Sequence, residues 1–274
     1  MSNDVLEQSE AERLLHRFTT HFGIAAARPK RAVLADVIRA FAQLPYENLS
    51  KIIKTSRAGA GVSLRRGPTE VICEHQQWGT GGTCFSLTFT LLQLLRTLGW
   101  RAEPILADRR YGANTHCALL IWLDESPHLI DPGYLIVDPV PLPRSKCQRV
   151  VTEFNEIVLV PREEGKLVNL STWQQGRETY RLTYKTAPVD AGEFVRAWDA
   201  SFGWDMMRYP LLTRAVDRRQ IYLRGTRLQV RDQQHVQRTN VIIEQLPVVV
   251  ATDFGIQPGI VRQALEVLRQ RGEL

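Results

Sequence analysis

The first third of the chain carries hydrophobic residues at helical spacing. Between residues 11 and 44, apolar side chains recur every three or four positions, which is the pattern of amphipathic helices. Pro45 is expected to end the second helix. The apolar stretch 84–98 ends at Gly99, a typical helix C-cap, and its two apolar faces predict a central, buried helix. Residues 55–70 are rich in Gly, Ser and Arg and are expected to form a loop.

Beyond this helix the pattern changes to short apolar runs that indicate strands. Residues 118–123 and 128–131 predict an antiparallel pair joined by the turn 124–127. The other expected elements are strands at 157–160 and 180–185, a hairpin over 221–230, helices at 194–202 and 259–271, and extended loop at 139–143. The predicted elements come in a fixed order, with helices first, strands next and both kinds at the C-terminal end. This order predicts an α+β fold rather than a doubly wound sheet.

Composition places the chain among folded proteins. It has 274 residues, 44% of them hydrophobic and 23% charged, which excludes a disordered, collagen-like or coiled-coil protein. The longest uninterrupted apolar run, residues 117–123, is far shorter than the roughly 20 residues of a membrane span. Because the first residues are polar and acidic, no signal peptide is evident, and we expect a cytoplasmic protein without membrane contact.

The charge favours small anions over nucleic acid. The net charge is +6, but the arginines are scattered, with short pairs such as Arg65-Arg66, Arg109-Arg110 and Arg218-Arg219. Nucleic-acid binders usually concentrate basic residues on one face among aromatics, so we expect no nucleic-acid partner. The four cysteines are too few for a disulfide scaffold, and the absence of CxxC and HExxH motifs predicts no metal site.

Cys84 is the sharpest chemical feature of the sequence. It follows Gly81 and Gly82 and opens the apolar helix. At a helix N-terminus the peptide dipoles and free amides favour a thiolate, and the same amides can hold an oxyanion. The two glycines are expected to let a substrate approach the backbone closely.

His116 and Asp131 are the candidate partners of this cysteine. A nucleophilic cysteine needs a base, and the base needs a group that orients it. His116 begins one predicted strand run and Asp131 ends the next, so the hairpin would bring both to one open end. The sequence therefore predicts a catalytic Cys84–His116–Asp131 triad.

Four segments resemble the arylamine N-acetyltransferase family, a branch of the transglutaminase-like Cys-His-Asp proteins. Thr80-Gly81-Gly82-Thr83-Cys84-Phe85 resembles the family's Arg-Gly-Gly-x-Cys-aromatic motif. The other three are Pro45-Tyr46-Glu47-Asn48-Leu49, Asp131-Pro132-Gly133-Tyr134 and Asp253-Phe254-Gly255-Ile256, similar to Pro-Phe-Glu-Asn-Leu, Asp-Val-Gly-Phe and Phe-Gly-Ile. The resemblance implies the same triad and three domains: helical (1–99, ending in the cysteine helix), antiparallel β-barrel (100–188) and α/β lid (189–274).

Three positions depart from the family pattern. The family arginine is Thr80 here, the glutamate two residues after the cysteine is Ser86, and the glycine that closes the aspartate motif is Leu135. We hypothesise that an ion pair bracketing the cysteine is replaced by a neutral contact of Thr80 and Ser86.

The resemblance implies ping-pong acyl transfer from a thioester to a small-molecule amine. The donor would be acetyl-CoA, bound as a co-substrate rather than permanently, and the acceptor an arylamine or hydrazine. No Walker or Rossmann motif marks a CoA site, so this donor rests on the resemblance alone. The alternatives are an amide synthase using a carrier-bound thioester, a transglutaminase-like amidase or peptidase, and a non-catalytic binding scaffold.

Overall fold

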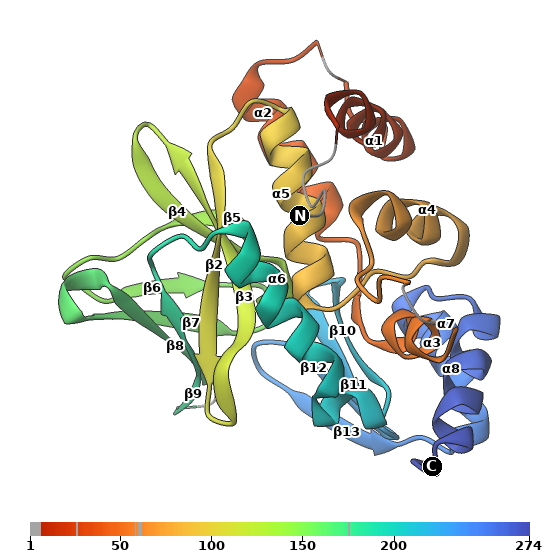
Figure 1. The fold of residues 1–274 in the computed structure, drawn as a ribbon. Coiled ribbons are helices and arrows are strands. Elements are labelled where there is room, and N and C mark those ends of the chain that lie inside the picture. Colours follow the sequence, from red (N-terminus) through yellow and green to blue (C-terminus); the bar gives the residue numbers. More distant parts are fainter. Residues whose placement is uncertain (1–6, 26, 58, 60–61, 175) are drawn as a thin grey trace.

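The protein has the expected α+β fold, with helices at both ends of the chain and strands between them. The computed structural model describes residues 7–25, 27–57, 59, 62–174 and 176–274. Its α-helices are α1 (Gln8–His21), α2 (Lys30–Phe41), α3 (Leu49–Arg57), α4 (Pro68–Trp78), α5 (Cys84–Thr97), α6 (Ala191–Ala200), α7 (Leu246–Phe254) and α8 (Pro258–Gln270). Figure 1 shows α5 between the large sheet and helices α1 and α4.

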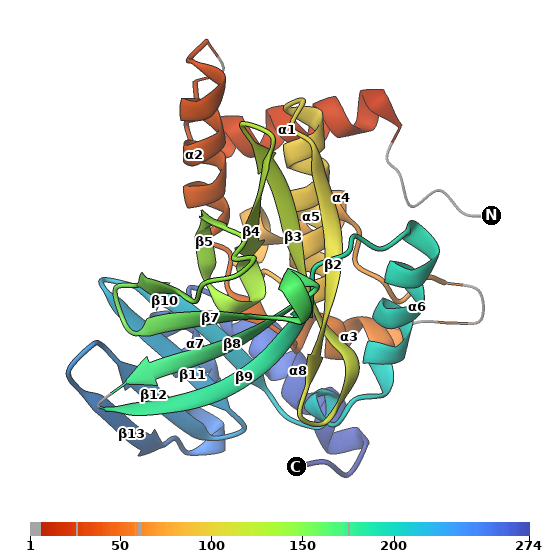
Figure 2. The same cartoon turned by 90° about the vertical axis from the view of Figure 1, so that its left-hand side faces the viewer.

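The central part of the chain forms an antiparallel sheet of eight strands that curls into a nearly closed barrel. The strands are β2 (Ala102–Arg109), β3 (Gly112–Leu123), β4 (Ser126–Asp131), β5 (Ile136–Pro141), β6 (Gln148–Val151), β7 (Glu156–Arg162), β8 (Leu167–Gln174) and β9 (Arg177–Lys185). Their order is β5-β4-β3-β2-β9-β8-β7-β6, so β5 and β6 are the edges. Figure 2 shows β2–β4 upright and β7–β9 crossing below them.

A second sheet joins the two ends of the chain. Its strands are β1 (Tyr46–Glu47), β10 (Leu211–Val216), β11 (Arg219–Arg224), β12 (Arg227–Arg231) and β13 (Val236–Asn240), in the order β1-β10-β11-β12-β13. Tyr46 pairs with Thr213, and α3 packs against α8. Residues 46–47, which also contact Gly82 in front of Cys84, are therefore anchored to the C-terminal part. The boundaries after residues 99 and 188 stay a prediction.

Helix α5 is the centre of the largest core. Phe85, Leu87, Leu91, Leu94 and Leu95 are almost completely buried, and the same cluster includes side chains of α1, α2, β3 and α6. Burial of large apolar side chains stabilises each by about 1.5–3 kcal/mol, so this helix is held firmly from several sides. The predicted central helix is confirmed, and it gives Cys84 a rigid support.

Several local predictions need correction. The stretch 139–143 is not only loop: β5 ends at Pro141, where proline is tolerated because β5 is an edge strand. The expected loop 55–70 overlaps the end of α3 and the start of α4, and residues 58 and 60–61 lie outside the described part. The elements that were not predicted are the strands β1, β2, β6, β8, β10 and β13 and the helices α3, α4 and α7. Within the described residues, no helix is long and apolar enough to cross a membrane.

Candidate active site

Cys84 lies at the first position of α5, as the sequence predicts. Thr83 is the N-cap, but its side chain makes no capping hydrogen bond. The first amides of a helix have no partner inside the helix, so the amides beside Cys84 can bind an anion. The cysteine itself is only 2% exposed.

The glycines before Cys84 are needed for packing of the protein itself. A Cβ atom on Gly81 would lie 1.9 Å from the Pro45 carbonyl oxygen, and one on Gly82 would lie 2.3 Å from Ser86 Oγ. The Gly82 carbonyl also accepts a hydrogen bond of 3.0 Å from the Glu47 amide. The expectation that these glycines open the backbone to substrate is corrected, because their open faces are filled by neighbouring protein atoms.

The hairpin of β3 and β4 brings His116 and Asp131 together. His116 Nε2 lies 2.6 Å from Asp131 Oδ2, and both side chains are completely buried. A Cβ atom on Gly133 would lie 2.9 Å from His116 Cε1, 3.2 Å from Cys84 Cβ and 3.3 Å from Asp131 Oδ1. All three predicted site residues therefore surround one glycine, which explains why position 133 has no side chain.

Asp131 is held by two further groups. Its Oδ1 accepts a 2.9 Å hydrogen bond from the Tyr134 amide, and its Oδ2 accepts one of 2.6 Å from the Tyr184 hydroxyl. Tyr184 is fully buried on β9 and was not predicted as a site residue. Leu135, at the place of the family glycine, has a φ of +60°, a left-handed conformation that is strained for leucine.

The electrostatics of the site favour an ionised cysteine. Cys117 lowers the pKa of the Cys84 thiol well below its usual value by hydrogen bonding. The hydrogen bond and charge of His116 and the charge of Arg109 act in the same direction, against the effect of burial. Burial alone would lower the pKa of His116, but the charge and hydrogen bond of Asp131 raise it. Both shifts stabilise a thiolate–imidazolium pair.

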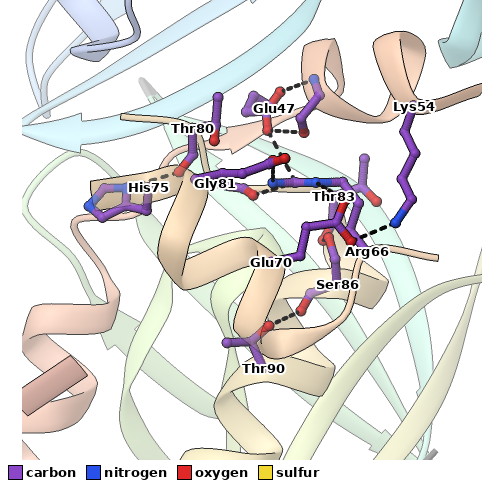
Figure 3. A network of polar contacts seen from close by, with 12 residues as sticks. Glu47, Lys54, Arg66, Glu70, His75, Thr80, Gly81, Thr83, Ser86 and Thr90 are labelled. Carbon is purple, nitrogen blue, oxygen red and sulfur yellow. Dashed lines mark hydrogen bonds and ion pairs between the residues drawn. The ribbon is translucent and has the colours of Figure 1, made fainter. Parts of the chain in front are cut away.

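The hypothesis of a neutral Thr80–Ser86 contact is wrong. Ser86 Oγ donates to the Thr83 carbonyl at 3.1 Å, and Thr80 Oγ1 is buried without a hydrogen-bond partner among the described residues. A charged group is present instead, supplied by Arg66 from the loop before α4 (Figure 3). This group could not be predicted because its guanidinium comes from outside the motif.

Arg66 binds the cysteine loop and a set of carboxylates. It is 3% exposed, and its Nη1 donates to the Gly81 carbonyl at 2.7 Å (Figure 3). Its Nη2 lies 2.5 Å from Glu74 Oε2, its Nη1 3.6 Å from Glu47 Oε1, and its Nε 4.0 Å from Glu70 Oε1. The guanidinium thus ties the backbone in front of Cys84 to three acidic side chains.

Arg109, at the end of β2, reaches the other side of the site. Its Nη2 lies 2.9 Å from His116 Nδ1, and its Nη1 donates to the Tyr111 hydroxyl at 3.0 Å. Because a guanidinium only donates hydrogen bonds, Nδ1 can accept this bond only in neutral His116, whose single proton then lies on Nε2, facing Asp131. In the sequence Arg109 is visible only as part of a basic pair, since nothing local marks its contact with His116.

Comparison with known proteins agrees with this architecture. A profile of the N-acetyltransferase family matches residues 32–261. The fold is similar to the arylamine N-acetyltransferase of Mycobacterium abscessus, with a TM-score of 0.78 and 16% identity over 95% of this chain and 96% of that one. It is also similar to the M. smegmatis enzyme, with a TM-score of 0.75 and 20% identity over 93% of this chain and 98% of that one. The M. marinum enzyme in complex with CoA matches with a TM-score of 0.74 and 17% identity over 92% of this chain and 99% of that one. No curated protein sequence matches. The chain belongs to the N-acetyltransferase family, and its fold is that of the arylamine N-acetyltransferases.

Proposed function

We propose that the protein transfers an acetyl group from acetyl-CoA to an amine, with Cys84 as nucleophile, His116 as general base and Asp131 as the group that orients His116. The observation that carries the proposal is the 2.6 Å contact of His116 with Asp131 at the start of the helix that bears Cys84. Family membership supports an N-acetyltransferase, and the CoA complex of the M. marinum relative supports acetyl-CoA as the donor.

The first half-reaction acylates the cysteine. His116 Nδ1 takes the Cys84 proton, and the thiolate attacks the thioester carbonyl carbon. Amides in the first turn of α5 stabilise the oxyanion of the tetrahedral intermediate. The donor C–S bond then breaks, the acetyl group stays on Cys84, and the departing thiolate takes the proton from His116 and leaves as free CoA.

The second half-reaction consumes the acyl-enzyme. The amine nitrogen attacks the acyl carbon while His116 takes one of its protons. The bond between this carbon and Cys84 breaks, the sulfur leaves as a thiolate beside protonated His116, which restores the starting pair, and the amide product leaves. Asp131 stabilises the imidazolium in both halves, and Tyr184 and the Tyr134 amide hold the carboxylate in place.

Acylation of Cys84 tests the proposal directly. The protein is mixed with acetyl-CoA, and the mass of each cysteine peptide is followed before and after addition of 4-methoxyaniline. We expect acetyl on Cys84 that then moves to the amine, full loss in Cys84→Ala, and no change in Cys147→Ala, which removes an exposed cysteine.

Other outcomes would identify the competing functions. Cleavage of a peptide amide without any amine acceptor would favour a transglutaminase-like hydrolase. A cysteine that accepts acetyl only from a carrier-protein thioester would favour an amide synthase. A Cys84 that accepts no acyl group would overturn the acyltransferase proposal and favour a binding scaffold.

A further inference from the structure

We propose that Arg109 recognises a carboxylate on one of the two substrates and thereby sets the specificity of the site. The inference rests on the proposed function, because it assigns the substrate class of that reaction. It starts from the position of the guanidinium, 2.9 Å from the nitrogen of His116 that would receive the substrate proton.

Arg109 has no carboxylate partner of its own. Within the described residues, no Asp or Glu oxygen lies at ion-pair distance from it, whereas Arg66 has three such neighbours. The nearby Asp131 is already occupied, because Oδ1 binds the Tyr134 amide and Oδ2 binds His116 and Tyr184. Arg109 is half-buried, and a cation partly withdrawn from water without a paired anion is costly, so a ligand anion would lower that cost.

The guanidinium also retains unused hydrogen-bond donors. Arginine has five N–H groups, and the hydrogen bonds to His116 and to Tyr111 use only two of them. Nε is buried and has no partner in the described part of the chain. A carboxylate is the ligand that best fits this planar fork, because it accepts two parallel hydrogen bonds.

Two aromatic rings lie beside Arg109. Its guanidinium carbon lies 5.5 Å from the centre of the Tyr134 ring and 6.0 Å from that of Tyr111. The Tyr134 ring is half-buried and shields one side of the guanidinium from water, which strengthens a charge-assisted hydrogen bond, whereas Tyr111 is 67% exposed and leaves its side open to an incoming ligand. Both rings also provide an apolar surface for the carbon skeleton that carries the carboxylate.

Recognition and activation would be coupled at His116. The Nδ1 atom has one lone pair, and Arg109 occupies it in this arrangement. A substrate carboxylate that draws the guanidinium onto itself would free Nδ1 to take the proton from Cys84 or from the amine. The carboxylate could be carried by the acceptor amine or by the far end of the acyl group, since both lie beside Cys84 during transfer.

Paired substrates distinguish the two sources. For the acceptor, kcat/KM is measured with 4-aminobenzoate and 4-aminobenzamide, using acetyl-CoA. For the donor, malonyl-CoA is compared with acetyl-CoA, using 4-methoxyaniline. We expect one of the two acid-to-neutral ratios to fall about 30-fold in Arg109→Gln, the change that corresponds to roughly 2 kcal/mol for a buried charge pair.

The variants separate recognition from general damage. Arg109→Lys keeps the charge but not the fork and should retain part of the preference. Arg110→Gln, which removes the exposed neighbour on the same hairpin, should leave both ratios unchanged. A general loss of activity lowers the acid and the neutral substrate equally, so it does not change a ratio. If neither ratio changes in Arg109→Gln, the proposal is overturned while acyl transfer itself still stands.

A binding experiment keeps the inference testable if the protein proves inactive. Calorimetry on Cys84→Ala, which forms no acyl-cysteine, compares the same two pairs of compounds with and without Arg109→Gln. Preferential binding of one acid that disappears with Arg109→Gln supports recognition of a carboxylate. Equal binding of acid and neutral compounds, with Arg109 present, would refute it whether or not acyl transfer occurs.

Discussion

Arg66 contacts the backbone in front of Cys84 and Arg109 contacts His116, and the surroundings of these two arginines differ in kind. Arg66 is surrounded by Glu47, Glu70 and Glu74 and also binds the Gly81 carbonyl. Arg109 touches a histidine and a tyrosine hydroxyl and has no carboxylate partner in the described part of the chain. A cation paired with carboxylates holds structure together, whereas one without a carboxylate partner is available to a ligand or to the chemistry.

This difference separates structural support, which we assign to Arg66, from reactivity, which we assign to Arg109. The Arg66 network fixes the backbone that leads into α5, so its loss should appear first in stability. Arg109 faces His116 and acts electrostatically on Cys84, so its loss should appear first in specificity and reactivity. The following variants test that division, beginning with the largest effect.

Removal of Arg66 should be strongly destabilising. Arg66→Ala leaves Glu47 and Glu74 without their buried cation, and breaking a buried ion pair in this way typically costs about 3–5 kcal/mol. Arg109→Gln leaves no carboxylate unpaired and should cost about 1 kcal/mol. Urea denaturation measures both free energies of unfolding. Equal losses in the two variants would contradict the proposed division.

A relocated guanidinium should partly replace Arg66. Thr80 is fully buried next to Gly81, whose carbonyl Arg66 binds. In wild type, Thr80→Arg places a second cation beside Arg66. In the Arg66→Ala variant, the same substitution places a cation beside carboxylates that have lost their partner. We therefore expect the two substitutions to be non-additive by about 1–3 kcal/mol in unfolding free energy, in the stabilising direction.

Thr80→Val provides the matched control for this cycle. It keeps the shape of threonine and removes a buried hydroxyl that has no hydrogen-bond partner in the described structure, so stability should hold or rise. Additive effects of Thr80→Arg and Arg66→Ala would show that position 80 cannot reach the acidic side chains.

The sequence alone was sufficient to place those site residues whose positions depend on neighbouring residues in the chain. Cys84 opens its helix as predicted, because a glycine-rich loop and an apolar run adjoin in the chain. His116 and Asp131 meet because a short hairpin joins their strands, and only fifteen positions separate them. Local geometry therefore predicted the placement of these three residues, although their catalytic roles remain a proposal.

The missed residues depend on contacts that no local pattern reveals. Tyr184 reaches Asp131 from 53 positions away, through the pairing of β9 with β2. Arg66 compensates for the missing motif arginine from a different segment, so inspection of positions 80 and 86 alone led to a wrong neutral contact. The two glycines were misinterpreted for the same reason, since the atoms that fill their open faces belong partly to Pro45 and Arg66.

Loss of the Tyr184 hydroxyl should lower the free energy of unfolding moderately, because this hydroxyl supports Asp131, the partner of His116. Tyr184→Phe keeps the buried ring but removes one donor to the Asp131 carboxylate, at a typical cost of about 1.5–3 kcal/mol for a bond to a charged group. Tyr180→Phe, which removes a hydroxyl bonded to Thr183, is the control and should cost less. A Tyr184→Phe protein as stable as wild type would mean that the carboxylate does not depend on this donor.

The smallest expected effect is on the ionisation of Cys84. The charge of Arg109 lowers the pKa of this thiol, after the larger effects of Cys117 and His116. Removing this charge in Arg109→Gln should therefore raise the pKa of Cys84. Reaction with iodoacetamide should then begin at a higher pH than in wild type, and at pH values below the raised pKa its rate should be a few-fold lower. Arg66→Lys keeps the charge on the other side of the loop and should leave the pH profile in place. Peptide mass spectrometry of the labelled cysteine measures all three profiles. If Arg66→Lys shifts the profile as much as Arg109→Gln does, the two arginines influence the thiol alike, and the separation of support from reactivity fails.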